Sequence, residues 1–120
     1  MSWSDQFYAA LMSSGEFASL ISSLSFEYKA DAKAPYATYQ LITQEGTEDL
    51  DGSGVEGYYL IQLNIWASSP TKTHDLAALA VESAKQNLVV TDVFQRSLSR
   101  SADDELFGYA VDFTVWFDNP

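Results

Sequence analysis

The only histidine of the chain, His74, is its best candidate for a catalytic group, and it lies beside Asp75. A histidine oriented by a carboxylate can act as the general base for a serine nucleophile. The sequence has no G-x-S-x-G segment, however, to form the sharp turn that presents such a serine. A metal site with two histidine ligands is excluded because there is one histidine. We therefore expect His74 to be an exposed residue near a helix start, and we predict no catalytic residue.

A second candidate for nucleophilic chemistry is the segment Ser69-Pro70-Thr71-Lys72, which has the S-x-x-K spacing of a serine–lysine pair. The companion motifs S-D-N and K-T-G are absent from the sequence. A serine followed by a proline is also an ordinary helix start, with the serine as N-cap and the proline at the first helical position. We interpret the segment as a helix start, and we predict that the chain is not an enzyme and holds no cofactor.

Carboxylates and glycines gather between Gln44 and Gly57, a combination that calcium-binding loops use. Gly52 falls too early for an EF-hand loop, and no closing glutamate stands at the required offset. We therefore predict no metal site, and we expect a long solvated connection that becomes ordered against a partner. Residues 100–105 are expected to form a second, charged turn. The candidate contact residues in these two connections are Glu45, Glu48, Asp49, Asp51, Glu56, Arg100, Asp103, Asp104 and Glu105.

Charge and composition narrow the classes of function further. The 120 residues include six lysines and arginines against 17 aspartates and glutamates, for a formal net charge of −11. Nucleic acid repels a surface of its own sign, so specific nucleic-acid binding is not expected. Cysteine is absent, which excludes disulfides and thiolate metal sites. No segment reaches the roughly 20 apolar residues of a membrane span, and the N-terminus lacks a signal-peptide pattern, so we expect a soluble cytoplasmic protein with no membrane partner.

The spacing of apolar residues predicts helices and strands along the chain. Helical spacing occurs in an N-terminal segment, 4–24, with a hinge at Gly15, and again over 71–87. Strands are predicted over 36–43, 57–66, 89–98 and 107–117. This order predicts one α+β domain spanning 1–120, in which a mostly antiparallel sheet of about four strands has helices packed on one face, with the sheet and main helix in 34–118.

Two tryptophans, Trp66 and Trp116, stand on the polar side of their predicted strands. Trp66 alternates with Gln62 and Asn64, and Trp116 shares its side of the strand with Asp112. If helices cover one face of the sheet, the other face presents these tryptophans among polar groups. Such a surface usually contacts another protein. We therefore expect Trp66 and Trp116 to lie in an interface.

Three strand segments together resemble the tail-completion or tail-terminator proteins of long-tailed bacteriophages and prophages. They are residues 34–42 (APYATYQLI), residues 61–67 (IQLNIWA), which an alanine-rich helix follows, and residues 111–117 (VDFTVWF). Each segment alone is typical of many strands, and it is their order and spacing that is similar to the family. The resemblance covers the chain from about Ala34 to its end.

The resemblance implies a structural role in the virion, at the head-proximal end of the tail. Members of this family form rings there, so we expect copies of this chain to assemble, in the bacterial host cytoplasm, into a ring of six. The ring would terminate the tail tube and contact the major tail tube protein and the head-side connector or stopper protein. DNA would pass through it without specific binding. The expected interface residues are those of the two acidic connections together with Trp66 and Trp116.

A different class of function stays open from the sequence alone. The chain could be an acidic protein-binding module, such as an inhibitor that imitates DNA and occupies a basic cleft of a host protein. The 17 acidic residues permit this role. Such mimics need carboxylates spread along one face, whereas many of the acids here fall in the two connections. Binding of a host nuclease or polymerase by the purified protein would favour this alternative.

Overall fold

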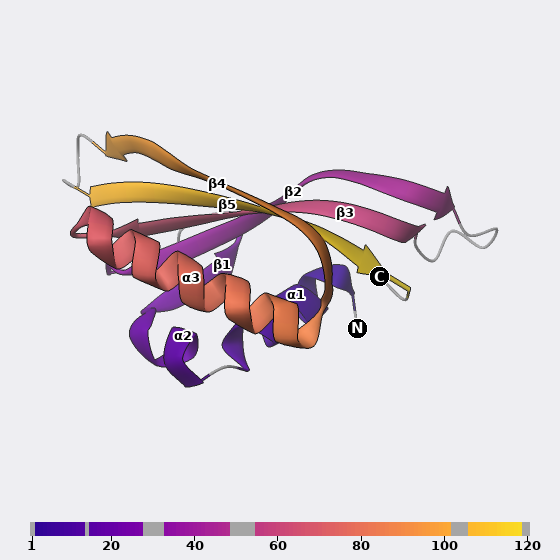
Figure 1. The fold of residues 1–120 in the computed structure, drawn as a ribbon, viewed down its shortest axis with the longest axis horizontal. Coiled ribbons are helices and arrows are strands. Elements are labelled where there is room, and N and C mark those ends of the chain that lie inside the picture. The colour runs from indigo at the N-terminus through magenta and orange to yellow at the C-terminus, as the bar shows by residue number, and fades with distance from the viewer. Residues whose placement is uncertain (1, 14, 28–32, 49–54, 102–105, 119–120) are drawn as a thin grey trace.

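The structure is a computed structural model, and it describes residues 2–13, 15–27, 33–48, 55–101 and 106–118. Within these ranges the chain forms three helices and a five-stranded sheet (Figure 1). The elements, in chain order, are α1 (Trp3–Met12), α2 (Gly15–Leu20), β1 (Ser23–Phe26), β2 (Tyr36–Glu48), β3 (Val55–Ala67), α3 (Pro70–Asn87), β4 (Val89–Ser101) and β5 (Leu106–Phe117).

The sheet has the strand order β1-β2-β3-β5-β4, and the helices pack on one of its faces (Figure 1). The pairs β2–β3, β3–β5 and β4–β5 are antiparallel, while β1 is parallel to β2. The predicted α+β class, with a mostly antiparallel sheet and helices on one face, is therefore confirmed.

The short strand β1 is an element that the sequence did not predict. The helical spacing extends to Leu24, but the second helix ends at Leu20, and Ser23–Phe26 pair with β2 instead. Backbone hydrogen bonds hold this strand at both ends, from the Ser22 amide to the Pro35 carbonyl at 2.7 Å and from the Glu27 amide to the Tyr39 carbonyl at 2.8 Å. Four residues are too few for hydrophobic periodicity to separate a strand from a helix, so tertiary pairing decides.

The strands on either side of the two predicted connections are longer than expected. β2 continues to Glu48 and β3 begins at Val55, and these two residues are still in register with each other. β4 likewise continues to Ser101, which is paired with Leu106. Acidic residues and glycine have a low intrinsic preference for strands, but the hydrogen bonds between the paired strands hold the backbone extended here. The described parts of the expected connection, residues 44–48 and 55–57, are therefore paired strands, and residues 49–54 lie outside the described residues.

Helix α3 begins as the sequence predicts, whereas α1 begins at Trp3, one residue before the predicted helical segment 4–24. The Ser69 hydroxyl accepts a hydrogen bond from the Lys72 amide at 3.2 Å, and Pro70 is the first residue of α3. The Ser2 hydroxyl accepts one from the Asp5 amide at 3.2 Å at the start of α1. Each bond satisfies an amide that has no partner within its helix. Residues 69–72 are thus a helix start rather than a serine–lysine pair.

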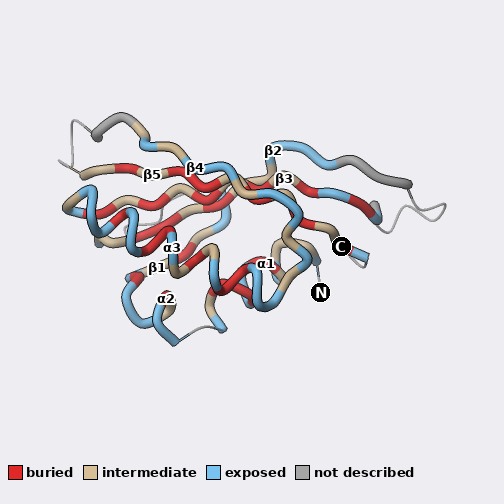
Figure 2. The backbone as a smooth tube through the Cα atoms, viewed as in Figure 1, coloured by how far each residue is buried: buried red, intermediate tan, exposed pale blue. Residues whose placement is uncertain are grey.

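The core lies between the sheet and the helices and is built on aromatic rings (Figure 2). Phe7 of α1 lies 5.6 Å from Phe113 of β5, between ring centroids, and both side chains are fully buried. α1 is also fastened to α3, because the buried Ser83 hydroxyl donates to the Ala10 carbonyl at 2.6 Å. That bond satisfies a carbonyl near the C-terminal end of α1, where helical partners run out. The N-terminal helices are therefore part of the same core as the sheet.

Tyr39 connects the buried face of β2 to α1, and it gives a testable pH dependence. Its hydroxyl lies 3.0 Å from the Ser4 hydroxyl and donates to the Ser4 carbonyl at 3.3 Å. Burial raises the pKa of Tyr39 above its ordinary value of 10.0, against an opposing effect of the Ser4 hydrogen bond. The unfolded chain therefore loses this proton at lower pH than the folded chain does, so the stabilisation is complete below pH 10 and is lost as pH rises further.

We expect Tyr39→Phe to reduce the fall in unfolding free energy between about pH 9 and pH 11, relative to the unmodified chain. Urea unfolding at a series of pH values, followed by tryptophan fluorescence, measures it. The matched control is Tyr58→Phe, because Tyr58 of β3 is exposed, whereas the nearby Tyr8 itself raises the pKa of Tyr39. An identical pH profile for Tyr39→Phe and the unmodified chain would count against this assignment.

Candidate assembly surface

We call the face of the sheet away from the helices the open face. Along each strand, side chains that point into the core alternate with side chains that point to the open face. On β3 the buried residues are Tyr59, Ile61, Leu63 and Ile65, and the residues between them point to the open face. On β5 the buried Val111, Phe113, Val115 and Phe117 leave Asp112, Thr114 and Trp116 on the open face. The described helices lie on the other side of the sheet (Figure 1), so the open face is not covered by them.

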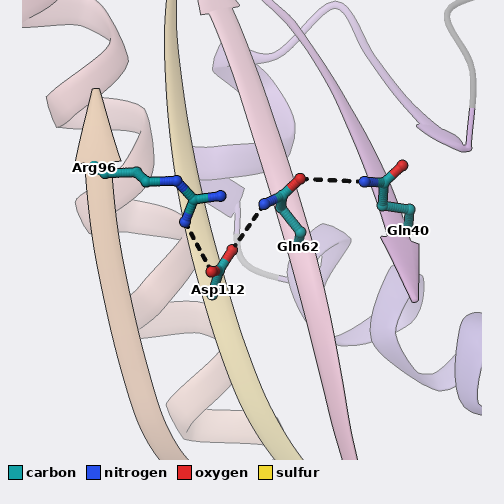
Figure 3. A network of polar contacts seen from close by, with 4 residues as sticks. All are labelled: Gln40, Gln62, Arg96 and Asp112. Carbon is teal, nitrogen blue, oxygen red and sulfur yellow. Dashed lines mark hydrogen bonds and ion pairs between the residues drawn. The ribbon is translucent and has the colours of Figure 1, made fainter. Parts of the chain in front are cut away.

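Polar side chains connect four strands across the middle of the open face (Figure 3). The Gln40 amide of β2 donates to the Gln62 side-chain carbonyl of β3 at 3.2 Å. Gln62 in turn donates to one oxygen of Asp112 on β5 at 3.2 Å. The other oxygen of Asp112 accepts from Arg96 of β4 at 2.8 Å. The side chains of Arg96 and Asp112 are 39% and 18% exposed, so this charged hydrogen bond lies only partly in water.

The network makes the centre of the open face nearly neutral. Two rows of residues are in register there: Thr38, Asn64, Ala110 and Arg96, and Gln40, Gln62, Asp112 and Phe94. These rows contain one cation and one anion, and the two are paired. In a chain of net charge −11, this is a surface that another acidic molecule can approach without strong repulsion.

Both predicted interface tryptophans lie on the open face and are half-buried there. The Trp116 ring meets the Tyr58 ring edge-on, with centroids 4.9 Å apart, and its Nε1 donates to the Asp118 carboxylate. The Trp66 ring lies over Gly108 of the neighbouring strand, directly across the ladder. The predicted face of the tryptophans is thus confirmed, while their part in an interface stays a prediction.

Gly108 is the residue that lets Trp66 lie flat on the sheet. A Cβ at this position would come within 2.5 Å of Cζ3 of Trp66, with two further ring atoms within 2.9 Å. We expect Gly108→Ala to displace the indole and to lower the unfolding free energy by about 1–3 kcal/mol, as overpacking does. Denaturant unfolding measures the loss, and a shifted tryptophan emission maximum reports the displacement. Gly15→Ala is the control, since a Cβ there meets nothing within 4 Å; equal effects of the two substitutions would refute the packing argument.

Large apolar side chains remain exposed on and beside this face. Phe94 and Val89 of β4 are each 60% exposed, and Tyr58 and Ile42 are each 46% exposed. The sequence did not place Phe94 on this face, because a β-bulge between Val90 and Asp92 shifts the register of β4 against β5. A bulge inserts one residue and so reverses which side chains face the core. Phe94 is consequently opposite Asp112 and points away from the helices.

The acidic candidate residues lie at two opposite ends of the sheet. Glu45 and Glu48 belong to β2, Glu56 to β3 and Arg100 to β4, and the Glu56 side chain is exposed. The β2–β3 end and the β4–β5 end lie far apart (Figure 1). The structure therefore does not bring the two groups together. Trp116 instead shares a cross-strand row with Tyr58 and Glu45 toward the β2–β3 end, and Trp66 pairs with Gly108 toward the β4–β5 end. The remaining candidates, Asp49, Asp51, Asp103, Asp104 and Glu105, lie outside the described residues.

The histidine singled out in the sequence lies on the surface of the molecule. His74 is exposed on α3, and its ring centroid lies 4.5 Å from that of Tyr109. Within the described ranges, no three His, Cys, Asp or Glu residues are grouped so that they could hold a metal ion. In the same part of the chain, no helix has the length and apolar character to cross a membrane.

Two solved structures have the same fold as this chain. The gp17 protein of bacteriophage SPP1 gives a TM-score of 0.64 at 12% sequence identity, and the similarity covers 97% of this chain and 88% of that one. A chain from the virion of a native gene transfer agent particle gives a TM-score of 0.55 at 12% identity, covering 96% and 93%. No family model and no curated protein matches the sequence. The fold thus agrees with the resemblance to phage tail-completion proteins.

Proposed function

We propose that this chain is a structural virion protein of a long-tailed phage or prophage that forms a ring at the head-proximal end of the tail. The ring terminates the tail tube and joins it to the head-side connector. The observation that carries the proposal is the open face, which combines half-buried tryptophans, exposed Tyr58 and Phe94, and a nearly neutral centre. Surfaces of this composition are typical of protein interfaces.

The fold supports the same proposal. This chain shares its fold, over almost its whole length, with gp17 of bacteriophage SPP1 and with a chain of a gene transfer agent virion. The partners we propose are other copies of the chain within the ring, and the major tail tube protein and the connector protein at its two rims.

The acidic ends of the sheet have a role in this proposal. Glu45 and Glu48 belong to β2 and the exposed Glu56 to β3, so acidic residues occur toward this end of the β2–β3 pair. In a ring through which DNA passes, carboxylates that face the channel keep the phosphates from binding, because the charges have the same sign. Carboxylates that face outward would contact the tube or the connector.

The alternative, a DNA-mimicking inhibitor, requires a continuous row of carboxylates. The two central rows of the open face carry instead one paired anion, together with amide, hydroxyl and aromatic side chains. A basic cleft would gain little from this surface. Stable binding of a host nuclease or polymerase to the purified chain would nevertheless revive this alternative.

Charge reversal at the hairpin tip tests the proposed function. We expect the triple variant Glu48→Lys, Asp49→Lys and Asp51→Lys to fail in restoring infectivity to heads and tails made without the native chain, while the native chain restores it. The control is reversal of Glu82, which is exposed on α3 and away from both ends of the sheet. Circular dichroism and thermal unfolding confirm that each variant is folded. Normal restoration by the triple variant would remove the hairpin tip from the assembly surface, and loss of folding would show a structural role.

A further inference from the structure

Phe94 projects from β4 as an apolar side chain between two charges. It is 60% exposed on the open face. Asp92, two residues before it, is exposed on the same face, and Arg96 follows two residues after it. The Arg96 guanidinium carbon lies 6.0 Å from the centroid of the Phe94 ring. Arg96 uses one nitrogen for Asp112, and the guanidinium has further N–H donors to offer.

A hollow elsewhere on the chain is complementary to Phe94 and its two charged neighbours, because it has apolar residues with one cation and one anion beside them. It lies between the end of α2, the start of β2 and the first turns of α3, has a volume of about 230 Å³, and is lined by Leu20, Pro35, Lys72, Asp75 and Leu76. Leu20 is 56% exposed, so its apolar side chain is accessible at this hollow. Lys72 and Asp75 are both exposed there and carry opposite charges.

Size and charge match between the two features. A cavity of about 150 Å³ lined by apolar side chains accommodates a benzene ring, so the larger hollow can accept the phenyl ring of a phenylalanine. Asp92 beside the ring is complementary to Lys72, and Arg96 is complementary to Asp75. Phe94 cannot reach the hollow of its own chain, because β4 and α2 lie on opposite sides of the molecule (Figure 1).

We infer that Phe94 of one copy inserts into the Leu20–Pro35–Leu76 hollow of the next copy. The contact joins two different surfaces of the same chain, so it is head-to-tail, and repeated head-to-tail contacts close into a ring when the rotation permits. The occupant is a second copy because both complementary halves are present on this chain. The inference rests on the proposed function for the ring itself, and it adds the residues that connect its neighbours.

Cysteine cross-linking tests the contact, since the chain contains no cysteine of its own. Chains carrying Thr91→Cys are mixed with chains carrying Ser19→Cys under assembly conditions and treated with a short bismaleimide. Both positions are exposed beside the proposed contact, and both substitutions leave Phe94 and Leu20 in place. The control mixture pairs Thr91→Cys with Glu82→Cys, because Glu82 is also exposed on α3 but does not line the hollow. We expect the covalent dimer to form at least about tenfold more in the first mixture, as specific contact of neighbouring groups requires.

Two results would overturn the inference. One is an equal yield in the two mixtures, including no dimer in either. The other is a predominance of dimers between two Thr91→Cys chains, which would indicate a contact of identical surfaces. If the dimer forms as expected but tails assemble normally without the chain, the contact stands and the proposed function fails. If the tails are defective but the dimer yields are equal, the function stands and this contact is wrong.

A charge exchange provides an independent readout of the same contact. We expect Lys72→Asp alone and Asp92→Lys alone each to decrease the fraction of assembled chains measured by light scattering, because each places like charges together. The double variant restores the attraction and should recover most of the assembly. Phe94→Ser should weaken association by at least about tenfold, as loss of an aromatic anchor does. A double variant as defective as the single ones would exclude the proposed pairing of Asp92 with Lys72.

Discussion

Replacing Phe113 with alanine is expected to lower the free energy of unfolding by about 3–5 kcal/mol, the loss typical of a large aromatic residue removed from a core. Phe113 is fully buried at the centre of β5, and its ring contacts that of Phe7. The substitution removes contacts to the sheet and to α1 together, and little space is available for neighbours to collapse into the cavity. Urea unfolding at low temperature measures the loss.

The matched control is Phe94→Ala, which changes the same residue type on the neighbouring strand. Phe94 is 60% exposed, so its replacement should change the free energy of unfolding by no more than about 0.5 kcal/mol. Since a domain of this kind is stable by only about 5–15 kcal/mol, Phe113→Ala should also unfold at a visibly lower temperature. Similar losses for the two variants would show that the assignment of the two faces of the sheet is incorrect.

Replacing Asp112 with alanine is expected to lower the free energy of unfolding by about 1–3 kcal/mol. Asp112 accepts hydrogen bonds from Arg96 and Gln62, and it is the central acceptor of the network on the open face. Its removal leaves a half-buried guanidinium and an amide without this acceptor. Chemical unfolding, followed by tryptophan fluorescence, measures the effect.

Two further variants separate the network from a general effect of charge. Asp92→Ala removes an exposed carboxylate of the same face and should change stability by no more than about 0.5 kcal/mol. The double variant Asp112→Ala with Arg96→Ala should be more stable than the sum of the single losses predicts, because the second substitution removes the cation that the first left unpaired. Strict additivity would mean that the Arg96–Asp112 contact contributes nothing.

The strands that line the core could be predicted from the sequence because each is buried on one side. Strict alternation in β3 and β5 identifies both the strands and the face on which Trp66 and Trp116 lie. The start of α3 was predictable as well, since the serine cap at Ser69 and the proline after it have local causes. Each of these features is determined by neighbouring residues in the chain, so the local sequence pattern is enough to predict it.

Features that depend on pairing between distant segments could not be predicted. β1 exists because Ser23–Phe26 find β2 as a partner, and Phe94 faces outward because of one bulge in β4. The ion pair between Arg96 and Asp112 follows from the register of β4 on β5. This register could not be predicted from the local pattern of either strand. The candidate interface was therefore predicted at its tryptophans but not at Phe94 and Arg96.

The acidic residues of the chain are unevenly distributed over the fold. The net charge of −11 disfavours nucleic-acid partners. The centre of the open face is nearly neutral, while described acidic positions such as Glu45, Glu48 and Glu56 lie at the end of the β2–β3 hairpin. Assembly through a neutral face allows like-charged copies to meet with little repulsion.

Electron microscopy of tails assembled in the absence of this chain tests the central claim most directly. The proposed function predicts tails of uncontrolled length, or tails of normal length that cannot join heads, and addition of the purified chain should correct the defect. The chain should also be present at the head-proximal end of complete particles, where a labelled antibody can locate it. Tails of normal length that join heads without the chain would contradict the proposed function.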